Sequence, residues 1–265
     1  MVLRPTPILG HSQKIKMTKY FLNYKKVFVE AIKRPLRWVY SRWNTRINND
    51  VMEFLEKYYN LPRPKIRRLL RVGRSLSADL WICSNPKTEA EIKSFYEHNP
   101  FPIFSLIAWH HTPYQIKLRD EFTKLAKGRV LDYGGGVGEL CVRVCKKGLP
   151  VTYADLQGPL FNFAHSFFRW HNMPITMINL SEEKIINQYD TIFCIDVIEH
   201  IINPQDIIEE MVSRLNPKGQ LIITALEPDV SENVPMHFEI TFDAKEYLHS
   251  LGMQKTDKPY LWIKR

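Results

Sequence analysis

Beyond residue 127, short apolar runs alternate with stretches in which apolar residues recur every three or four positions. Runs of four or five β-branched and aromatic residues are typical of buried strands, whereas the longer spacing is typical of amphipathic helices. Their alternation predicts an α/β domain with a parallel sheet and helices on both faces. We expect strands at residues 129–133, 150–154, 175–178, 191–195 and 220–224, and helices at residues 138–147, 160–170 and 204–215.

The chain before residue 127 mixes helical periodicity with many basic residues. Residues 1–18 show no periodicity and are expected to form a flexible tail. Apolar residues then recur at helical spacing over residues 20–46, where Pro35 is expected to break or kink the helix. Further helices are expected at residues 51–59, 66–76 and 114–126, and another is expected to begin at Thr88 and to stop at residues 99–102.

Charge divides the chain in a similar way. Residues 1–74 carry 18 Lys and Arg against 4 Asp and Glu, a balance of +14, whereas the remainder carries 19 against 24, a balance of −5. We therefore divide the chain into a tail (1–18), a basic helical N-terminal region with a lid (19–112) and an α/β domain (113–265). The basic region is interpreted as a helical cap with a solvated basic face, as a surface for anionic lipid or as a surface for nucleic acid.

Composition narrows the class of protein further. No run of eighteen apolar residues occurs, so no membrane-spanning helix is expected, and the N-terminus lacks the pattern of a secretory signal. The four cysteines, Cys83, Cys141, Cys145 and Cys194, fit neither a disulfide framework nor a zinc site. We expect a cytoplasmic protein whose cysteines are buried as small apolar side chains, with peripheral attachment to a membrane left open.

A glycine-rich loop follows the first expected strand of the α/β domain. Residues 132–138 read Asp-Tyr-Gly-Gly-Gly-Val-Gly, and a helix is expected to begin there. Glycines allow the backbone to turn sharply and a ligand to approach it closely. A dinucleotide site would continue as G-x-G-x-x-G, but the third glycine is replaced by Glu139, and Asp132 would repel a pyrophosphate. A carboxylate suits a ligand with an ammonium and a sulfonium group, so the loop favours S-adenosylmethionine.

The second expected strand ends at Asp155, about twenty residues beyond the start of the glycine loop. An acidic residue at this place can accept hydrogen bonds from both hydroxyls of a ribose. The alternative is a solvent-exposed Asp at the end of a strand. The glycine loop upstream favours the ribose role.

These motifs, taken together and in order, resemble the class I S-adenosylmethionine-dependent methyltransferases. The sequence YDTIFCIDVIEHI at residues 189–201 and the sequence LNPKGQLIIT at residues 215–224 complete the pattern. The nearest group contains the ubiquinone and menaquinone biosynthesis methyltransferases, and the resemblance covers roughly residues 127–226. It implies a Rossmann-like, seven-stranded, mostly parallel sheet that ends in an antiparallel hairpin, here expected within residues 253–264 after a helix.

The resemblance also implies which residues bind the cofactor. Asp132 and the glycine loop would hold the methionine end, Asp155 the ribose and the exit of the third strand the adenine. Asn179 stands where the family usually has Asp, but its amide oxygen can accept the same hydrogen bond. The implied cofactor-binding residues are Asp132, Gly134, Gly135, Gly136, Gly138, Asp155, Leu156, Asn179, Leu180, Asp196 and Val197.

His200 is the candidate catalytic residue, because methyl transfer to an oxygen requires that a proton be removed. Its alternative is a histidine that packs structurally at a helix start. Asp196, Glu199 and His200 form D-x-x-E-H, which resembles the E-x-x-E-H of some methyltransferases that bind a divalent metal, and His237 could add a ligand. We favour a structural or helix-capping role for this motif and assign no metal ligand.

Three side chains before the first strand are candidates for a lid over the cofactor. Tyr96, His110 and His111 occupy the part of the chain from which members of the family build such a lid. Each could equally be an ordinary core or surface residue.

The sequence therefore predicts an enzyme that transfers a methyl group from S-adenosylmethionine to the oxygen or carbon of a small acceptor. A lipophilic acceptor is one option. One alternative is an RNA or protein methyltransferase that binds its acceptor through the basic N-terminal region, and another is a non-catalytic scaffold with the cofactor fold. The intact loop and Asp155 disfavour the scaffold. The expected partners are a small-molecule acceptor and an anionic membrane surface contacted by residues 19–50, with nucleic acid less favoured.

Overall fold

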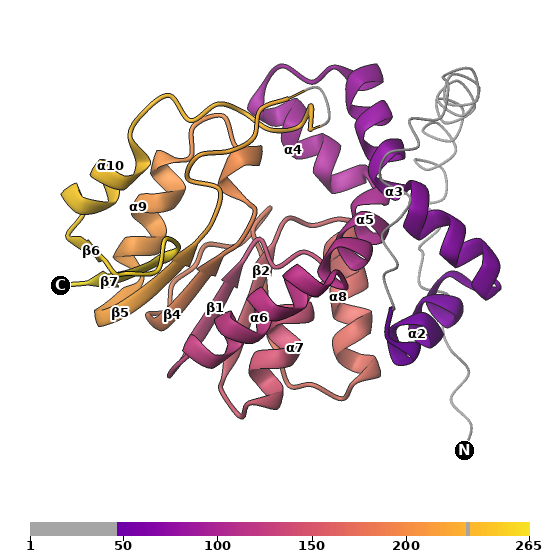
Figure 1. Ribbon diagram of the computed structural model, residues 1–265, viewed down its shortest axis with the longest axis horizontal. Helices are drawn as coiled ribbons and strands as arrows, with labels where there is room; N and C mark the ends of the chain where they lie inside the picture. Colours follow the sequence, from indigo (N-terminus) through magenta and orange to yellow (C-terminus); the bar gives the residue numbers. More distant parts are fainter. Residues whose placement is uncertain (1–46, 232–233) are drawn as a thin grey trace.

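Seven strands form one sheet in the order β3-β2-β1-β4-β5-β7-β6 (Figure 1). The computed structural model describes residues 47–231 and 234–265. The first five strands pair in parallel, and β7 pairs antiparallel with both β5 and β6. The Rossmann-like sheet and its terminal hairpin are therefore confirmed. The strands are β1 (Val130–Tyr133), β2 (Val151–Asp155), β3 (Thr176–Asn179), β4 (Tyr189–Cys194), β5 (Leu215–Ile223), β6 (Met253–Lys255) and β7 (Leu261–Lys264).

Helices cover both faces of the sheet, because successive strand residues point to opposite sides. In β4, Phe193 packs into the hydrophobic core shared with α7 and α8, whereas Ile192 and Cys194 pack into the core shared with α9. Figure 1 shows the two helical layers on either side of the strands. The helices are α6 (Pro113–Leu125), α7 (Glu139–Lys146), α8 (Pro159–Trp170), α9 (Gln205–Ser213) and α10 (Ala244–Ser250), and the 3-10 turn η2 (Ile198–His200) follows β4.

Four helices precede this domain in the part of the chain that the structure describes, and two of them differ from the expectation. Helix α3 continues to Ser84 instead of ending near residue 76, because Ser77 and Trp81 extend its buried face by one further turn each. The Asn99-Pro100-Phe101-Pro102 segment does not only end a helix but also begins another, since proline is tolerated in a first helical turn. The four helices are α2 (Asn49–Tyr59), α3 (Arg63–Ser84), α4 (Glu89–His98) and α5 (Phe101–His110).

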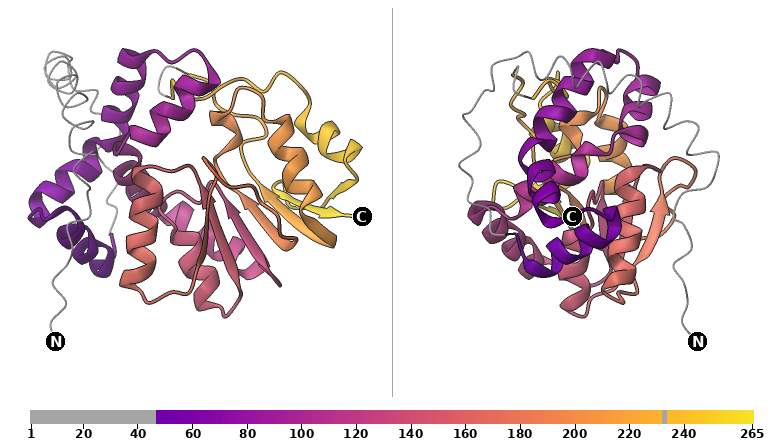
Figure 2. Two further views of the ribbon diagram at one scale, coloured as in Figure 1. Left: turned by 180° about the vertical axis from the view of Figure 1, so that it is seen from behind. Right: turned by 90° about the vertical axis from the view of Figure 1, so that its right-hand side faces the viewer.

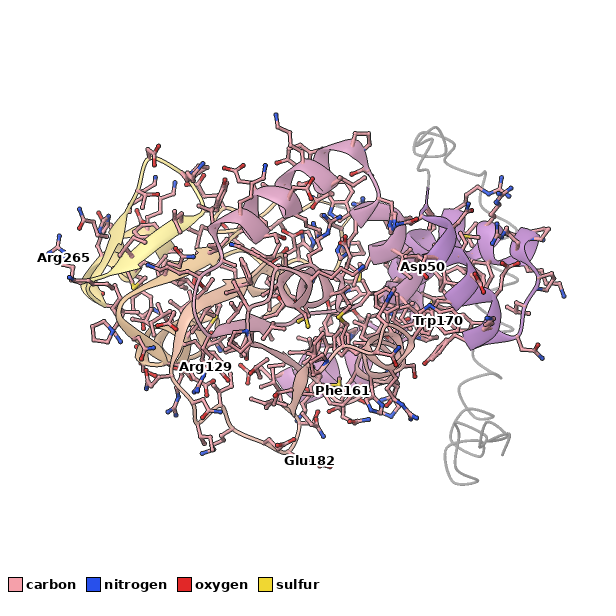
Figure 3. All side chains as sticks on the ribbon, turned by 90° about the horizontal axis from the view of Figure 1, so that it is seen from below. Asp50, Arg129, Phe161, Trp170, Glu182 and Arg265 are labelled. Atoms are coloured by element: carbon pink, nitrogen blue, oxygen red, sulfur yellow. The ribbon has the colours of Figure 1, made fainter. Side chains whose placement is uncertain are left out.

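Close packing attaches these helices to the α/β domain. A Cβ on Gly73 would lie 2.8 Å from the Cβ of Phe104, so only glycine lets α3 approach α5 this closely. Helix α2 packs on α8 through aromatic rings, and the indole N–H of Trp170 donates to Asp50 over 3.3 Å (Figure 3). As a result, α4 and the adjoining end of α3 are held above one edge of the sheet (Figure 2).

Several expectations concern residues outside the described part of the chain. The tail (1–18), the helix at residues 20–46 and nearly all of the proposed membrane-contact segment at 19–50 belong to this group. Among the described residues, no helix is both long and apolar enough to cross a bilayer. All four cysteines are free, but Cys83 is exposed near the end of α3, so the expectation that every cysteine is buried is wrong.

Candidate active site

A cavity of about 490 Å³ opens at the carboxyl ends of β1, β2 and β4, and helices α3, α4 and α5 contribute its opposite wall. Ligands of open α/β sheets bind at this edge, and the volume lies within the range of small-molecule sites. Ten of the twelve residues expected from the sequence line this cavity. They are Asp132, Gly134, Gly135, Gly136, Asp155, Leu156, Leu180, Asp196, Val197 and His200.

The glycine loop and Asp155 form one hydrogen-bonded unit. The backbone N–H of Gly136 donates to Oδ2 of Asp155 over 2.8 Å, and the N–H of Leu156 donates to Oδ1 over 2.7 Å. The Tyr153 hydroxyl donates to Oδ2 over 3.2 Å. Burial raises the pKa of Asp155 to about 6, while these donors act in the opposite direction. The loop therefore fixes the position of the carboxylate at the end of β2.

Steric contacts explain the glycine at the start of the loop. Gly134 has a φ of +67°, a conformation that other residues rarely adopt, and a Cβ there would lie 2.5 Å from Cγ2 of Val197. A side chain at this position would push β1 and β4 apart at the mouth of the cavity. The position of Val197, after β4, therefore depends on the absence of a side chain at Gly134, after β1.

The two remaining predicted residues do not line the cavity. Gly138 lies at the start of α7, where a Cβ would be 2.5 Å from the ring of Phe168, so its small size permits helix packing. The side-chain oxygen of Asn179 accepts from the backbone N–H of Ser181 over 3.0 Å. Asn179 thus shapes the turn that places Leu180 in the cavity wall.

The cavity wall holds the predicted Asp132 together with Arg119, which the sequence did not suggest. Asp132 is buried, and burial raises its pKa to about 7, while the Cys141 thiol and the charge of Arg119 oppose this shift. Arg119, on the buried side of α6, has Nε 3.2 Å from Oε2 of Glu139. The same oxygen lies 3.5 Å from Nδ1 of His110, whose pKa burial holds well below its usual range. Both Arg119 and His110 line the cavity.

Arg119 was missed because helical spacing shows which residues share a face but not what that face contacts. Its neighbours on the buried side of α6 are Gln115 and Phe122, so an arginine there was a visible exception. A buried arginine needs an anionic partner, and this one has Glu139 at the start of the glycine-loop helix.

His200 follows β4 and is held from two sides. Its Nδ1 lies 2.9 Å from the hydroxyl of Tyr96 on α4 and 3.2 Å from the carbonyl oxygen of Met236. A carbonyl only accepts, so the Met236 contact is a hydrogen bond when the ring proton is on Nδ1; the Tyr96 oxygen then accepts from the same N–H, and Nε2 is left as an acceptor. Burial and the neighbouring His237 lower the pKa of His200 to about 4, so the ring is neutral at pH 7.

In the structure, Asp196 of the D-x-x-E-H motif lies outside the group to which the other two residues of the motif, Glu199 and His200, belong. Oδ1 of Asp196 accepts from the Thr224 hydroxyl over 2.8 Å, which directs this carboxylate towards the end of β5. Donor atoms of Glu199, His200 and His237 lie within 4.8 Å of one another and form a group that could hold a metal ion. Glu199 is buried, and burial together with Asp196 raises its pKa to about 8. We continue to assign no metal ligand.

Only two of the three lid candidates, Tyr96, His110 and His111, line the cavity. Tyr96 and His110 line the cavity, whereas His111 does not and instead contacts the Ile107 carbonyl oxygen through Nδ1 over 2.8 Å. Next to His200, the cavity has an apolar chamber in which Ile92, Ile202 and Met236 pack together with Tyr96. Leu106 belongs to the glycine-loop end of the same cavity. Further apolar lining comes from Leu160, Ile201 and Ile207, and the charged residues from α3 and α4 are Arg74, Glu89 and Lys93.

The site combines a glycine loop after β1, an acidic residue at the end of β2 and an adjoining apolar chamber in an open α/β sheet. This combination is typical of enzymes that bind a cofactor next to a second ligand. A family model described as a methyltransferase domain matches residues 108–258, more than half of the chain, and the chain belongs to this family. The predicted class, a class I S-adenosylmethionine-dependent methyltransferase, is thereby confirmed, together with its enzymatic nature.

Curated relatives agree with this class. The chain is 28% identical over 112 residues to a protein of Rickettsia bellii (strain OSU 85-389) named ubiquinone biosynthesis O-methyltransferase, and the match covers 42% of this chain and 47% of the relative. A protein of the same name from Rickettsia akari (strain Hartford) is 30% identical over 104 residues, which cover 38% and 41%. The chain therefore spans about half the length, or less, of the curated relatives it matches.

Solved structures show the same fold. Phosphoethanolamine N-methyltransferase 2 of Haemonchus contortus, in complex with S-adenosyl-L-methionine, superposes with a TM-score of 0.50 and 17% sequence identity. The match covers 61% of this chain and 44% of that structure. At this identity the likeness concerns the fold alone.

Proposed function

We propose that this methyltransferase transfers the methyl group of S-adenosylmethionine to an oxygen of a small apolar acceptor. The observation that carries the proposal is the two-part cavity, in which expected cofactor residues and an apolar chamber share one space with His200. The matched Rickettsia proteins are named O-methyltransferases, which favours oxygen over carbon. The residues that line the two parts of this cavity come from elements that are far apart in the sequence.

The side chains of Asp132 and Arg119 suit the methionine end of the cofactor. The ammonium group of a bound amino acid would meet the Asp132 carboxylate, and its carboxylate would meet the Arg119 guanidinium, since both side chains are buried in the cavity wall. Glycines 134–136 leave the backbone open to close approach. Asp155 would accept from the ribose hydroxyls, and Leu156 and Leu180 would contact the adenine.

His200 is placed to handle the acceptor's proton. When bound, S-adenosylmethionine supplies a methyl group on a positively charged sulfur. The Nε2 lone pair of His200 would take the acceptor's hydroxyl proton as the new oxygen–carbon bond forms, which leaves an imidazolium. The Met236 carbonyl already accepts from Nδ1, so this bond strengthens as the ring becomes charged. The apolar residues beside His200 would limit the access of water to the reacting atoms.

Cofactor affinity should depend on pH because two of its ligands have raised pKa values. Asp132 titrates near pH 7 and Asp155 near pH 6 in the free protein. Binding of an ammonium group favours the ionised form of Asp132, so affinity is full above its free pKa and falls as pH drops below it. We expect a loss of about tenfold for each pH unit below pH 7, and a steeper loss below pH 6. Calorimetry in a pH series measures this, and an affinity unchanged between pH 5 and 7 would contradict the Asp132 assignment; Asp132→Asn should flatten the profile.

The acceptor class can be tested by following the formation of S-adenosylhomocysteine. A panel should compare a hydroxylated aromatic compound with an alkyl chain, the same ring without the chain, a primary amine of equal size, and total RNA. We expect turnover with the first compound, weaker turnover with the second and none with the amine. Turnover only with RNA or protein would replace this proposal by a macromolecular acceptor.

A further inference from the structure

Helix α3 carries a concentrated positive charge. Between residues 63 and 78 it holds six Lys and Arg and not a single Asp or Glu. Arg67 and Arg71 lie one turn apart, and both are exposed, as are Lys65 and Arg68. The opposite side of the helix, with Ile66 and Leu70, is buried. We define the basic face of α3 as Lys65, Arg67, Arg68 and Arg71.

The basic face has no acidic partner within residues 47–231 and 234–265. Arg63, at the start of the helix, pairs with Glu56 over 2.9 Å, but none of the four face residues forms an ion pair there. Four neighbouring cations repel one another, and a polyanionic surface relieves this repulsion. The chemistry of the face therefore fits a partner with many phosphate or carboxylate groups.

The same helix forms part of the wall of the active-site cavity. Arg74 and Ser77, one and two turns beyond Arg71, both line the cavity. Ile82, eleven residues and about three turns beyond Arg71, lies on the same side of α3 and is 48% exposed. A row of cations followed by an exposed apolar side chain is the arrangement by which an interfacial helix meets headgroups and the acyl boundary.

We propose that the basic face of α3 docks this enzyme on an anionic lipid bilayer, with the cavity wall next to the membrane surface. The docking itself rests on α3 alone, whereas the delivery of an apolar acceptor from the bilayer to the chamber rests on the proposed function. Single-stranded nucleic acid fits less well, because single strands bind by stacking bases on exposed aromatic rings. The aromatic residue of α3, Trp81, is buried.

The test uses the full chain and two matched double variants. Arg67→Gln with Arg71→Gln removes two charges from the basic face, and Lys117→Gln with Lys124→Gln removes two exposed charges from α6. Glutamine is a good helix former, so both variants should fold. Co-sedimentation with phosphatidylcholine vesicles that contain phosphatidylserine measures the partition coefficient. We expect about a 30-fold loss for the α3 variant, about fivefold for each cation, and little change for the α6 variant.

Binding to pure phosphatidylcholine should be weak, and higher salt should weaken binding to the anionic vesicles. An unchanged partition coefficient for the α3 variant, or an equal loss in the α6 variant, would overturn the proposal. Binding of double-stranded RNA that is lost in the α3 variant, without vesicle binding by the unmodified chain, would overturn it in favour of nucleic acid.

Calorimetry with S-adenosylhomocysteine separates this inference from the proposed function. Both variants should bind it as the unmodified chain does, because the four substituted residues do not line the cavity. A loss of vesicle binding with intact cofactor binding supports the docking surface. Failure of the unmodified chain to bind S-adenosylhomocysteine would instead contradict the proposed function and leave the vesicle result standing.

Discussion

Substitution of His200 by asparagine should lower the single-turnover rate of methyl transfer by about 10²- to 10⁴-fold, the range typical of a general base. The asparagine amide nitrogen can occupy the place of Nδ1 and still donate to the Met236 carbonyl, so the local backbone keeps its partner. What the variant lacks is the proton acceptor at Nε2. Affinity for S-adenosylhomocysteine should stay the same, because the cofactor residues are not altered.

A second substitution distinguishes the base from its support. Tyr96→Phe removes the hydroxyl 2.9 Å from Nδ1 but leaves the imidazole and its bond to Met236, so we expect a smaller loss of about tenfold or less. Single-turnover rates are the appropriate measurement, since product release limits the steady-state rate of many enzymes. A His200→Asn variant that keeps most of the unmodified rate at saturating cofactor would remove His200 from the mechanism.

Substitution of Asp155 by alanine should weaken cofactor binding by about 1.5–3 kcal/mol, the contribution of hydrogen bonds to a charged group. The carboxylate has two tasks. It would accept from the ribose, and it already accepts from the backbone N–H groups of Gly136 and Leu156. Alanine removes both, so the glycine loop loses a fixed partner as well as the ligand contact.

Asparagine at position 155 and a distant acid provide the controls. Asp155→Asn keeps one side-chain acceptor and should lose less affinity than alanine. Glu182→Ala removes an exposed carboxylate beyond β3 and should leave the affinity unchanged (Figure 3). Calorimetry with S-adenosylhomocysteine measures all three. A folded Asp155→Ala variant with an unchanged dissociation constant would refute the ribose assignment.

The parts of the fold that could be predicted are those whose signal is local. The strands are apolar runs bounded by turn residues, and the glycine loop and Asp155 mark the carboxyl ends of β1 and β2. Local patterns also gave the start of α4, where Thr88 and Glu91 form a capping box. The continuation of α3 beyond residue 76 was missed because it depends on packing of Trp81 against Phe95 and Tyr96 of α4. The division of the chain at residue 112 stays a prediction.

The parts of the site that could not be predicted depend on contacts between distant segments. Tyr96 and His200 are 104 residues apart, and nothing near either of them signals the other. Arg119 reaches the cavity only because α6 packs beside the glycine-loop helix. The sequence could identify the residues at strand ends, whose direction the sheet determines, but not the side chains that helices bring to them.

The cofactor identity is tested by a calorimetric titration of the unmodified chain with S-adenosylhomocysteine and, separately, with NAD. The cavity lining holds the carboxylate of Asp132 at the end of β1 and the guanidinium of Arg119, a pair suited to an amino-acid group, and the carboxylate would repel a pyrophosphate. We expect one S-adenosylhomocysteine to bind per chain, with weaker binding at lower pH, and no heat from NAD. Binding of NAD without any response to S-adenosylhomocysteine would show that the cavity is not a site for S-adenosylmethionine.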